Sequence, residues 1–319
     1  MLMGRARCLP LAFCLLSVIA HAQEAKLESG KPVKREIAGG ESHTYQISLA
    51  VGQFVRIVVE QKAIDVALVL AAPDGKQVVE INFTAAGGLE SLSAEAAASG
   101  DYRLTVRASG SAALAGSYQV RPEVKAAATA QDRQRIAAER WMLEADELRK
   151  QAGKMAEQAI DKLQQALSVW RSLSDPYWTA WSLSRIGVAN FDLSRHDKAI
   201  EHYEQALAIH REIKDRAGEG ITLNGLGVAY SNLGRHDKAV EYYEQALAIS
   251  REVKNRAGEG GAMISLGNAS RNLGRSEEAI EYYEQAVVIH REVKDRAGEG
   301  RALNNLGIAY SSLGRYERA

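Results

Sequence analysis

The seven histidines are the side chains of this chain with the widest capacity for acid–base and metal chemistry. Metal ligands on one helix lie three or four residues apart so that they share a face, and no two of these histidines have that spacing. Two pairs occupy equivalent positions of an internal repeat, in turns or at the outer ends of helices. The sequence therefore predicts no metal site and no cofactor. The histidines are His21, His43, His196, His202, His210, His236 and His290, and the equivalent pairs are His196 with His236 and His210 with His290.

Glycine pairs and carboxylate pairs also recur along the chain. Gly218-Glu-Gly220 and Gly225-Leu-Gly227 have a superficial similarity to phosphate-binding loops, but no strand is expected before them and no Gly-Lys-Ser/Thr follows. Carboxylate pairs such as Glu241 with Glu244 return one repeat later, which is typical of a solvated helix face. No Gly-x-Ser-x-Gly nucleophile motif occurs. The sequence predicts that the chain is not an enzyme.

Asparagines and arginines at recurring positions indicate binding instead. Asn224 and Asn304 share one position of the repeat, and a carboxamide can both donate and accept hydrogen bonds with a peptide main chain. Arg271 and Arg301 would attract an acidic group. The alternative is that these asparagines are tolerated polar residues in a wet groove.

An internal repeat of 40 residues must position these side chains. Ala217–Arg256 returns almost unchanged as Ala257–Arg296 and begins a third time at 297–319, where the chain ends within the unit. Looser copies are Tyr177–Arg216 and Ala137–Pro176. A period of this length indicates an array of stacked units, because no single unit can bury its own apolar face.

Each unit is expected to be a pair of helices. In Ala217–Leu233, apolar residues recur at three- and four-residue steps on one face. Gly234 suits the C-terminal cap of this helix. Asp237 is expected to accept hydrogen bonds from the first amides of the second helix, whose apolar pattern starts after Lys238.

The unit resembles the tetratricopeptide repeat, through Leu223, Leu226-Gly227, Tyr230 and Ala239. In that family a small residue of the first helix, here Gly227, packs against an alanine of the second, here Ala239. A longer second helix, with Arg251 in place of the usual proline, departs from the family pattern. The resemblance covers roughly residues 137–319. It implies an all-α right-handed solenoid whose first helices line a concave groove for a peptide or protein partner.

The resemblance also implies which side chains face the groove. The candidates for peptide binding are Trp181, Ser184, Val188, Asn224, Val228, Asn232, Asn268, Arg271, Arg301 and Asn304, and the further groove positions are Phe191, Asp192, Ile221, Ser231, Ile264, Asn272, Ile308 and Ser311. All four tryptophans, Trp141, Trp170, Trp178 and Trp181, lie around the first two units. They are expected to fill the join between irregular and regular units. The alternative is that Trp181 is an aromatic anchor for a ligand at the mouth of the groove.

Residues 33–123 have a period of two. Alternating segments such as Tyr45–Leu49 and Tyr102–Val106 are separated by glycine-containing turns, and Phe54–Val59 is a nearly continuous apolar run. Seven or eight such strands predict an antiparallel β-sandwich. The expected fold class is therefore multidomain β + α. An N-terminal sandwich precedes the solenoid at 137–319, and residues 124–150 form a helical linker that includes the first helix of the array.

The sandwich resembles the pre-peptidase C-terminal type of module, through Ile64-Asp65-Val66, Ala72–Lys76 and Gly100–Val106. The resemblance implies an exported, non-catalytic module that assists folding or contacts partners, and some members of that family bind calcium. Asp65 and Asp74 would then supply oxygen ligands. The alternative is that Asp74 shapes a Pro-Asp-Gly turn and Asp65 bonds a neighbouring loop.

The N-terminus predicts export. Residues 1–22 combine two arginines, an apolar run at Leu9–Ala20 and a small-x-small cleavage site, which is typical of a secretory signal peptide. The run is too short to span a bilayer, although an uncleaved anchor is the alternative. Residues 23–32 are expected to be an extended lead-in. Both cysteines, Cys8 and Cys14, lie in the signal segment, so no disulfide is expected in the mature protein.

These observations predict a periplasmic or secreted bacterial scaffold for peptide or protein partners. Lys plus Arg and Asp plus Glu number 40 each, so no nucleic acid or membrane partner is expected. The order of sandwich and repeats also resembles the N-terminal half of bacterial CHAT-domain proteins. On that alternative the chain is the recognition half of a caspase-like peptidase whose catalytic module lies beyond residue 319. Calcium- or carbohydrate-dependent adhesion through the sandwich is a third possibility, and the truncated last unit predicts self-association.

Overall fold

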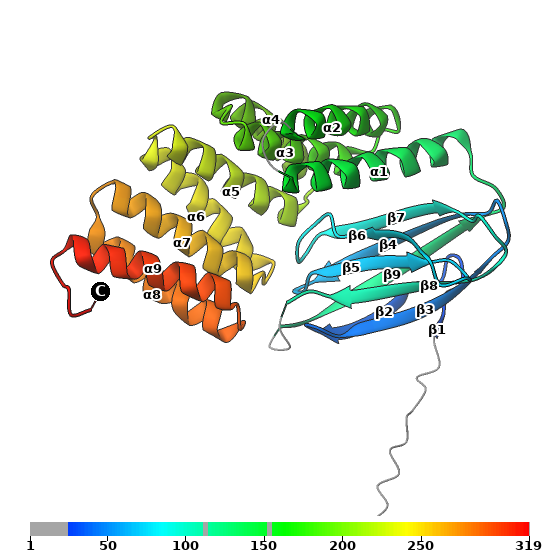
Figure 1. Ribbon diagram of the computed structural model, residues 1–319, viewed down its shortest axis with the longest axis horizontal. Helices are drawn as coiled ribbons and strands as arrows, with labels where there is room; N and C mark the ends of the chain where they lie inside the picture. Colours follow the sequence, from blue (N-terminus) through cyan, green and yellow to red (C-terminus); the bar gives the residue numbers. More distant parts are fainter. Residues whose placement is uncertain (1–24, 111–113, 152–154, 319) are drawn as a thin grey trace, which may run out of the picture.

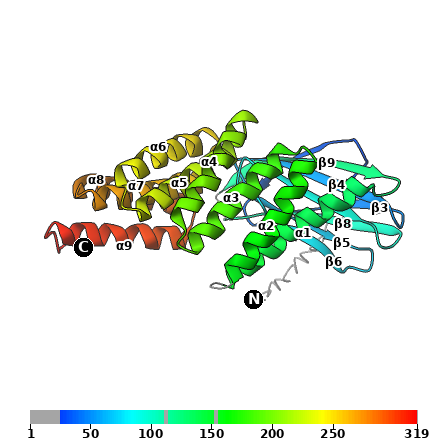
Figure 2. The ribbon, with the colours of Figure 1, turned by 90° about the horizontal axis from the view of Figure 1, so that it is seen from above.

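The computed structural model describes residues 25–110, 114–151 and 155–318. In these residues nine strands come first and nine helices follow, as Figure 1 shows. Seen from above, the strands occupy one end of an elongated molecule and the stacked helices extend away from them (Figure 2). The predicted order of a β-sandwich followed by a helical solenoid is confirmed. The signal peptide expected at residues 1–22 lies outside the described residues.

Two sheets form the sandwich. The first has the order β1 (Ala25–Lys26), β3 (Ser42–Leu49), β8 (Gly100–Ala108), β5 (Val66–Ala71) and β6 (Gln77–Ile81), and the second has the order β2 (Val33–Ala38), β9 (Ala115–Lys125), β4 (Phe54–Lys62) and β7 (Leu89–Glu95). Neighbouring strands are antiparallel, except that β1 runs parallel to β3. The short β1 lies in the segment that was expected to be a lead-in, and β9 continues two residues past 123.

The core of the sandwich follows from the alternation of side chains along each strand. In β8, Tyr102, Leu104 and Val106 are buried while the residues between them face outward. Residues from both sheets belong to one apolar cluster. Strand β7 differs, because Glu90–Ala94 are all buried. One face of this strand meets the sandwich core, and the other is covered by the first helix.

The helices form antiparallel pairs, and each pair packs on the next. They are α1 (Ala130–Lys150), α2 (Met155–Ser172), α3 (Pro176–Asp192), α4 (His196–Glu212), α5 (Arg216–Asn232), α6 (His236–Glu252), α7 (Arg256–Asn272), α8 (Ser276–Glu292) and α9 (Arg296–Ser312). Gly234 follows α5 with a φ of +73°, which confirms it as a terminating residue. Asp215, Asn255 and Asp295 cap the starts of α5, α7 and α9 by accepting from a glycine amide.

The expected capping role of Asp237 is wrong. Helix α6 begins at His236, so Asp237 already lies within its first turn, and the N-cap position is occupied by Arg235 without a side-chain cap. Asp237 instead lies 3.4 Å from Arg275 of the next unit. The apolar pattern placed the start of this helix two residues too late, because it cannot register the polar first turn.

Glycines of the first helices let tyrosine rings of the second helices pack against their backbone. A Cβ atom added at Gly227 would lie 2.5 Å from the Tyr243 ring, and one added at Gly267 would lie 2.5 Å from the Tyr283 ring. Tyr243 is 4% exposed. The Tyr243 ring is therefore the nearest group to an added Cβ at Gly227, a contact that the family pattern did not predict. No residue larger than glycine fits without moving the ring.

Helix α1 joins the two domains through a buried carboxylate. Glu139 accepts hydrogen bonds from the backbone N–H and the hydroxyl of Ser93 in β7, at 2.7 and 3.0 Å. Burial raises the pKa of Glu139 from 4.5 to about 7. In the same strand, Glu90 accepts from the N–H groups of Phe83 and Thr84, and burial raises its pKa to about 7 as well. Both groups therefore favour their protonated form in the folded chain when the pH is below about 7.

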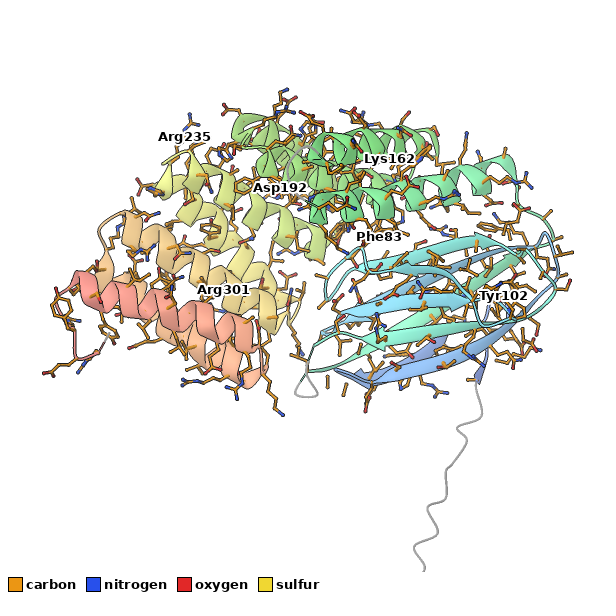
Figure 3. The ribbon with its side chains drawn as sticks, viewed as in Figure 1. Phe83, Tyr102, Lys162, Asp192, Arg235 and Arg301 are labelled. Carbon is orange, nitrogen blue, oxygen red and sulfur yellow. The ribbon has the colours of Figure 1, made fainter. Side chains whose placement is uncertain are left out.

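Helix α3 holds the loop between β6 and β7. The Tyr177 hydroxyl accepts from the Leu89 N–H at 2.7 Å, and Arg185 donates to the Phe83 carbonyl at 2.8 Å. The Phe83 ring packs edge-on against Trp178, with ring centroids 5.5 Å apart. Figure 3 shows Phe83 between the sheets and the helices. The sandwich is therefore fixed against the first half of the array.

We predict that Gly227→Ala destabilises the array. The new methyl group overlaps the Tyr243 ring, which outweighs the better helix propensity of alanine and costs about 1–3 kcal/mol. Gly261→Ala is the matched control, because it also lies in a first helix and no atom lies within 4 Å of its added Cβ. Urea denaturation followed by circular dichroism measures both variants. Equal urea midpoints for Gly227→Ala and Gly261→Ala would show that the Tyr243 ring packs equally well when residue 227 carries a methyl group.

We predict that Glu139→Gln makes stability less dependent on pH. A folded-state pKa of about 7 lies above the unfolded value of 4.5, so the contribution to stability is present below pH 4.5 and is lost as the pH rises through 7. The free energy of unfolding of the native chain should fall across this range, and the glutamine variant should lack up to about 3 kcal/mol of that fall.

Urea denaturation between pH 4.5 and 8 tests this prediction. Glu95→Gln is the control, because a hydrogen bond from Arg133 lowers the pKa of this exposed carboxyl. Its removal should leave the fall unchanged. If the free energy of unfolding falls by the same amount in the native chain and in Glu139→Gln, the Glu139 carboxyl group does not titrate in this range.

Candidate functional site

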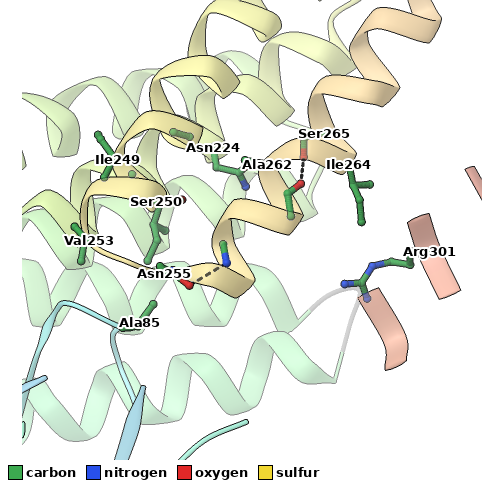
Figure 4. A pocket seen from close by; sticks show the side chains of 17 residues that line it. Ala85, Asn224, Ile249, Ser250, Val253, Asn255, Ala262, Ile264, Ser265 and Arg301 are labelled. Atoms are coloured by element: carbon green, nitrogen blue, oxygen red, sulfur yellow. Dashed lines mark hydrogen bonds between the residues drawn. The ribbon is translucent and has the colours of Figure 1, made fainter. Parts of the chain in front are cut away.

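A pocket of about 370 Å³ lies where the first helices of the array face the sandwich. Helices α5, α6 and α7 form most of its wall, the loop after β6 adds Ala85 and Ala86, and α9 contributes Arg301. Figure 4 shows the side chain of Arg301 reaching toward this space from α9, across from Ile264. The pocket therefore joins parts of the chain that are far apart in sequence, and we call it the junction pocket.

Two of the ten candidate peptide-binding residues line the junction pocket. Asn224 of α5 is partly buried, and Arg301 is exposed at the rim. Within the described ranges, neither side chain makes a hydrogen bond or an ion pair. Ile221 and Ile264, which were expected to face the groove, also line it. The structure therefore brings a carboxamide and a guanidinium, neither of which makes a hydrogen bond or an ion pair within the described residues, to one opening.

Trp181 and Ser184 lie in the core instead of on the groove surface. Trp181 is 4% exposed, and its indole N–H donates to Asp215 at 3.1 Å. Ser184 is also 4% exposed and shares a hydrogen bond with the Thr222 hydroxyl. Of the two roles left open for the tryptophans, this burial favours packing at the join between units.

The other candidates are spread along the first helices. The Asn232 carboxamide donates to the Val228 carbonyl of its own helix. Asn268 accepts from the Tyr283 hydroxyl at 2.8 Å and from the Asn305 amide at 3.1 Å, so it ties two units together. The remaining positions differ in exposure: Val188, Val228 and Arg271 are half-buried, and Asn304 is exposed.

His210 and His290 lie in the last turns of α4 and α8, as expected, but they are interior residues and do not face outward. They are 0% and 2% exposed. The Nδ1 atom of His210 lies 2.9 Å from Asp215, and that of His290 lies 3.0 Å from Asp295. A Cβ atom added at Gly218 would lie 2.2 Å from the His210 ring, so glycine makes room for the imidazole. These histidines pack the junction between consecutive units.

Sequence reasoning missed the residues that create the pocket. The sandwich loop at Ala85 and Ala86 could not be placed beside the array from sequence alone. Ser250 and Gly261 also line the pocket, and neither carries a group that attracts notice. A signal for both was present, because each is smaller than the residue at the same position of the other units.

The two aspartates proposed for calcium have partners of their own. Asp65 accepts from the Asn82 amide at 3.3 Å, and burial raises its pKa. Asp74 accepts from the N–H of Lys76, and this hydrogen bond lowers its pKa. Among the described residues, no group of three or more histidines, cysteines, aspartates or glutamates could hold a metal ion. A search of the same residues for a helix with the length and apolar character needed to cross a bilayer finds none.

Comparison with known proteins assigns the helical part to a family. The family model described as tetratricopeptide repeat matches residues 148–212, 178–252 and 260–319, which together make up just over half of the chain. No curated protein matches the sequence. The likenesses to the pre-peptidase module and to CHAT-domain proteins stay predictions, because every matched range starts at or after residue 148.

Three solved structures share the helical fold. Aspartyl phosphate phosphatase F from Bacillus subtilis has 18% identity and a TM-score of 0.53, covering 57% of this chain and 47% of that one. A signal transduction ATPase with a tetratricopeptide repeat sensor from Pyrococcus horikoshii has 20% identity and a TM-score of 0.52, covering 58% and 29%. A Rap protein complexed with competence and sporulation factor has 19% identity and a TM-score of 0.51, covering 58% and 51%. The chain thus spans about half or less of these proteins, and the likeness shows the fold alone.

Proposed function

The chain belongs to the tetratricopeptide repeat family, and we propose that it is an exported scaffold that binds a peptide or protein partner in the groove of its first helices. The observation that carries this proposal is the junction pocket, with Asn224 and Arg301 at its edge. Both side chains lack hydrogen bonds and ion pairs within the described residues. Polar groups of this kind bind a partner without first breaking an internal contact.

The chemistry of these side chains fits a peptide. A carboxamide can donate to a main-chain carbonyl and accept from a main-chain N–H, so it recognises an extended backbone whatever its side chains. Asn304 is exposed on α9 at the position equivalent to Asn224. Arg301, one turn before Asn304, adds positive charge for a carboxylate. The Rap structure with a similar helical fold is complexed with competence and sporulation factor, which adds support.

The sandwich limits where a partner can enter. A Cβ atom added at Gly87 would lie 3.4 Å from Val253 and 3.7 Å from Ala217, so the loop after β6 touches the array beside the pocket. A partner would therefore run from the junction pocket toward α9, past Arg301 and Asn304.

The alternative proposal is that the chain is the recognition half of a caspase-like peptidase. Its support is the order of a sandwich followed by long repeats, and it assigns the same groove to substrate recognition. Reading the gene past codon 319 tests it. Further repeats followed by a His/Cys module would support the peptidase, whereas an immediate polar cap would support the scaffold alone.

We predict that Asn224→Ala combined with Asn304→Ala weakens peptide binding and leaves the fold intact. A random peptide library displayed on phage is selected on the immobilised native chain, and the dissociation constant of the best synthetic peptide is then measured by fluorescence anisotropy. The loss of two hydrogen bonds should raise the dissociation constant about tenfold. Helicity should not change, since neither carboxamide makes a hydrogen bond to another described residue.

Gln164→Ala combined with Gln205→Ala is the control for this pair. Both glutamines are exposed carboxamides on second helices, away from the groove. If the asparagine variant keeps both its helicity and its affinity for the peptide, the proposal that the peptide binds in the groove is contradicted.

Export gives a separate prediction. Expression in a bacterial host should yield a periplasmic or secreted protein whose intact mass corresponds to a first residue of Gln23, because the cleavage site is predicted after Ala22. Mass spectrometry of the fractions measures this. A full-length mass in the cytoplasm would contradict the signal peptide, and one in the membrane fraction would support the uncleaved anchor.

A further inference from the structure

We infer that the junction pocket receives one aromatic side chain of the bound peptide, next to an acidic residue that faces Arg301. This inference rests on the proposed function and adds the class of ligand. It comes from the shape of the pocket, from its lining and from the charge at its rim.

The shape of the pocket follows from a missing ring. The last turn of the second helix carries a buried ring in three units, namely Trp170, His210 and His290, and the corresponding residue of the third unit is Ser250. The position that an imidazole fills beside α5 and α9 therefore holds no ring beside α7, where the Asn255 side chain lies against Gly258 at the wall of the pocket. Ser250 lines the pocket at this point.

A second small residue enlarges the same space. Gly261 of α7 corresponds to Trp181, Ile221 and Arg301 in the other units. No atom lies within 4 Å of a Cβ added at Gly261. Two departures from the repeat thus fall on one cavity, although they are on different helices. Together they leave room for a flat side chain from another molecule.

The lining of the pocket favours an apolar ring over a charged chain. Ile221, Ile249 and Val253 form its walls together with alanines from the array and from the sandwich loop. Ile221 is 38% exposed in the unbound chain, and a ring inserted beside it would remove this apolar surface from water. A buried cation would lack a partner there, because no carboxylate lines the pocket, and the only charged residue of the lining, Arg301, lies at its rim.

The rim of the pocket, in contrast to its apolar walls, favours a charged group, namely an acidic residue that can pair with Arg301. Arg301 makes no ion pair in the described residues, whereas Arg216, Arg256 and Arg296 each pair with a glutamate. Glu299, the carboxylate nearest in sequence, already pairs with Arg291 and Arg296. Asp295 accepts from the Gly298 N–H, and this hydrogen bond and the charge of Arg301 both lower its pKa. Arg301 forms an ion pair with neither carboxylate, so its guanidinium can pair with an acidic residue adjacent to the inserted ring.

The chain itself provides a design that fills the pocket. Ser250→His combined with Asn255→Asp recreates the histidine and aspartate found at 210 with 215 and at 290 with 295. Gly258 is retained, and it corresponds to the glycines that make room for those rings. This variant should therefore fold, and circular dichroism and thermal melting check that it does. Gly261→Ile, which introduces the residue found at the same position of α5, is a second filled variant.

The test uses the random peptide library on the full chain. The native chain should enrich peptides with an aromatic residue beside Asp or Glu, and replacing the ring by alanine in the best peptide should weaken binding at least about tenfold. The Ser250→His/Asn255→Asp variant and the Gly261→Ile variant should each bind the best peptide and its alanine-substituted form with equal affinity. Arg301→Gln should lose the preference for the acidic residue and keep that for the ring, and Lys198→Gln, an exposed cation on α4, should behave like the native chain.

Failure of this inference can be told apart from failure of the proposed function. If peptides are enriched without an aromatic residue, or if the ring is still preferred by both folded filled variants, the pocket assignment is overturned while groove binding stands. If no peptide is enriched on the native chain, the peptide scaffold and the pocket assignment both fall.

Discussion

The contact between a glycine backbone and a tyrosine ring sets the spacing of each helical pair. Gly187, Gly227 and Gly267 lie against Tyr203, Tyr243 and Tyr283, at distances that leave no room for a Cβ atom. Because the same contact recurs in the α3–α4, α5–α6 and α7–α8 pairs, the helices of these pairs meet at the same separation and this part of the stack is regular. The groove is a consequence of this regularity, since it is the line that the first helices trace along the stack.

A second constraint is the buried junction between the sandwich and the array. Glu139 binds Ser93, Tyr177 binds Leu89 and Arg185 binds Phe83, and all of these hydrogen bonds cross from helix to strand or loop. Burial raises the pKa of Glu139 to about 7. This carboxyl group can be accommodated in the interior only because each of its oxygens accepts a hydrogen bond from Ser93. The sandwich is thus held at one place beside the groove, where its loop becomes part of the wall of the junction pocket.

The sequence allowed the fold to be predicted well where the pattern is local. The period of 40 residues placed the helical pairs, and alternation placed the strands, because both patterns record which faces of an element meet the core. The predicted start of α6 was wrong because the first turn of this helix is polar and the apolar pattern does not register it. The Tyr243 ring against Gly227 was not predicted, because the family pattern names an alanine that lies one turn earlier in α6.

The candidate site was less predictable because its parts are brought together by tertiary structure. The family pattern selected Asn224 and Arg301, which line the junction pocket, but it also selected Trp181, which is buried and whose indole N–H donates to Asp215. The contribution of Ala85 depends on a loop that lies far from the array in sequence. No periodicity in the sequence records that contact.

Differences among near-identical units carry the information that the repeats themselves do not. The pairs Arg211–Glu219, Arg251–Glu259 and Arg291–Glu299 are the same in three units, and they stabilise stacking wherever they occur. A ligand that contacted only such repeated groups would bind equally well in several registers along the groove. Ser250, Gly261 and Arg301 depart from the repeat and meet at one opening, so they single out one register. Specificity in a regular array therefore has to come from residues that break its regularity, and in this chain those residues surround the junction pocket.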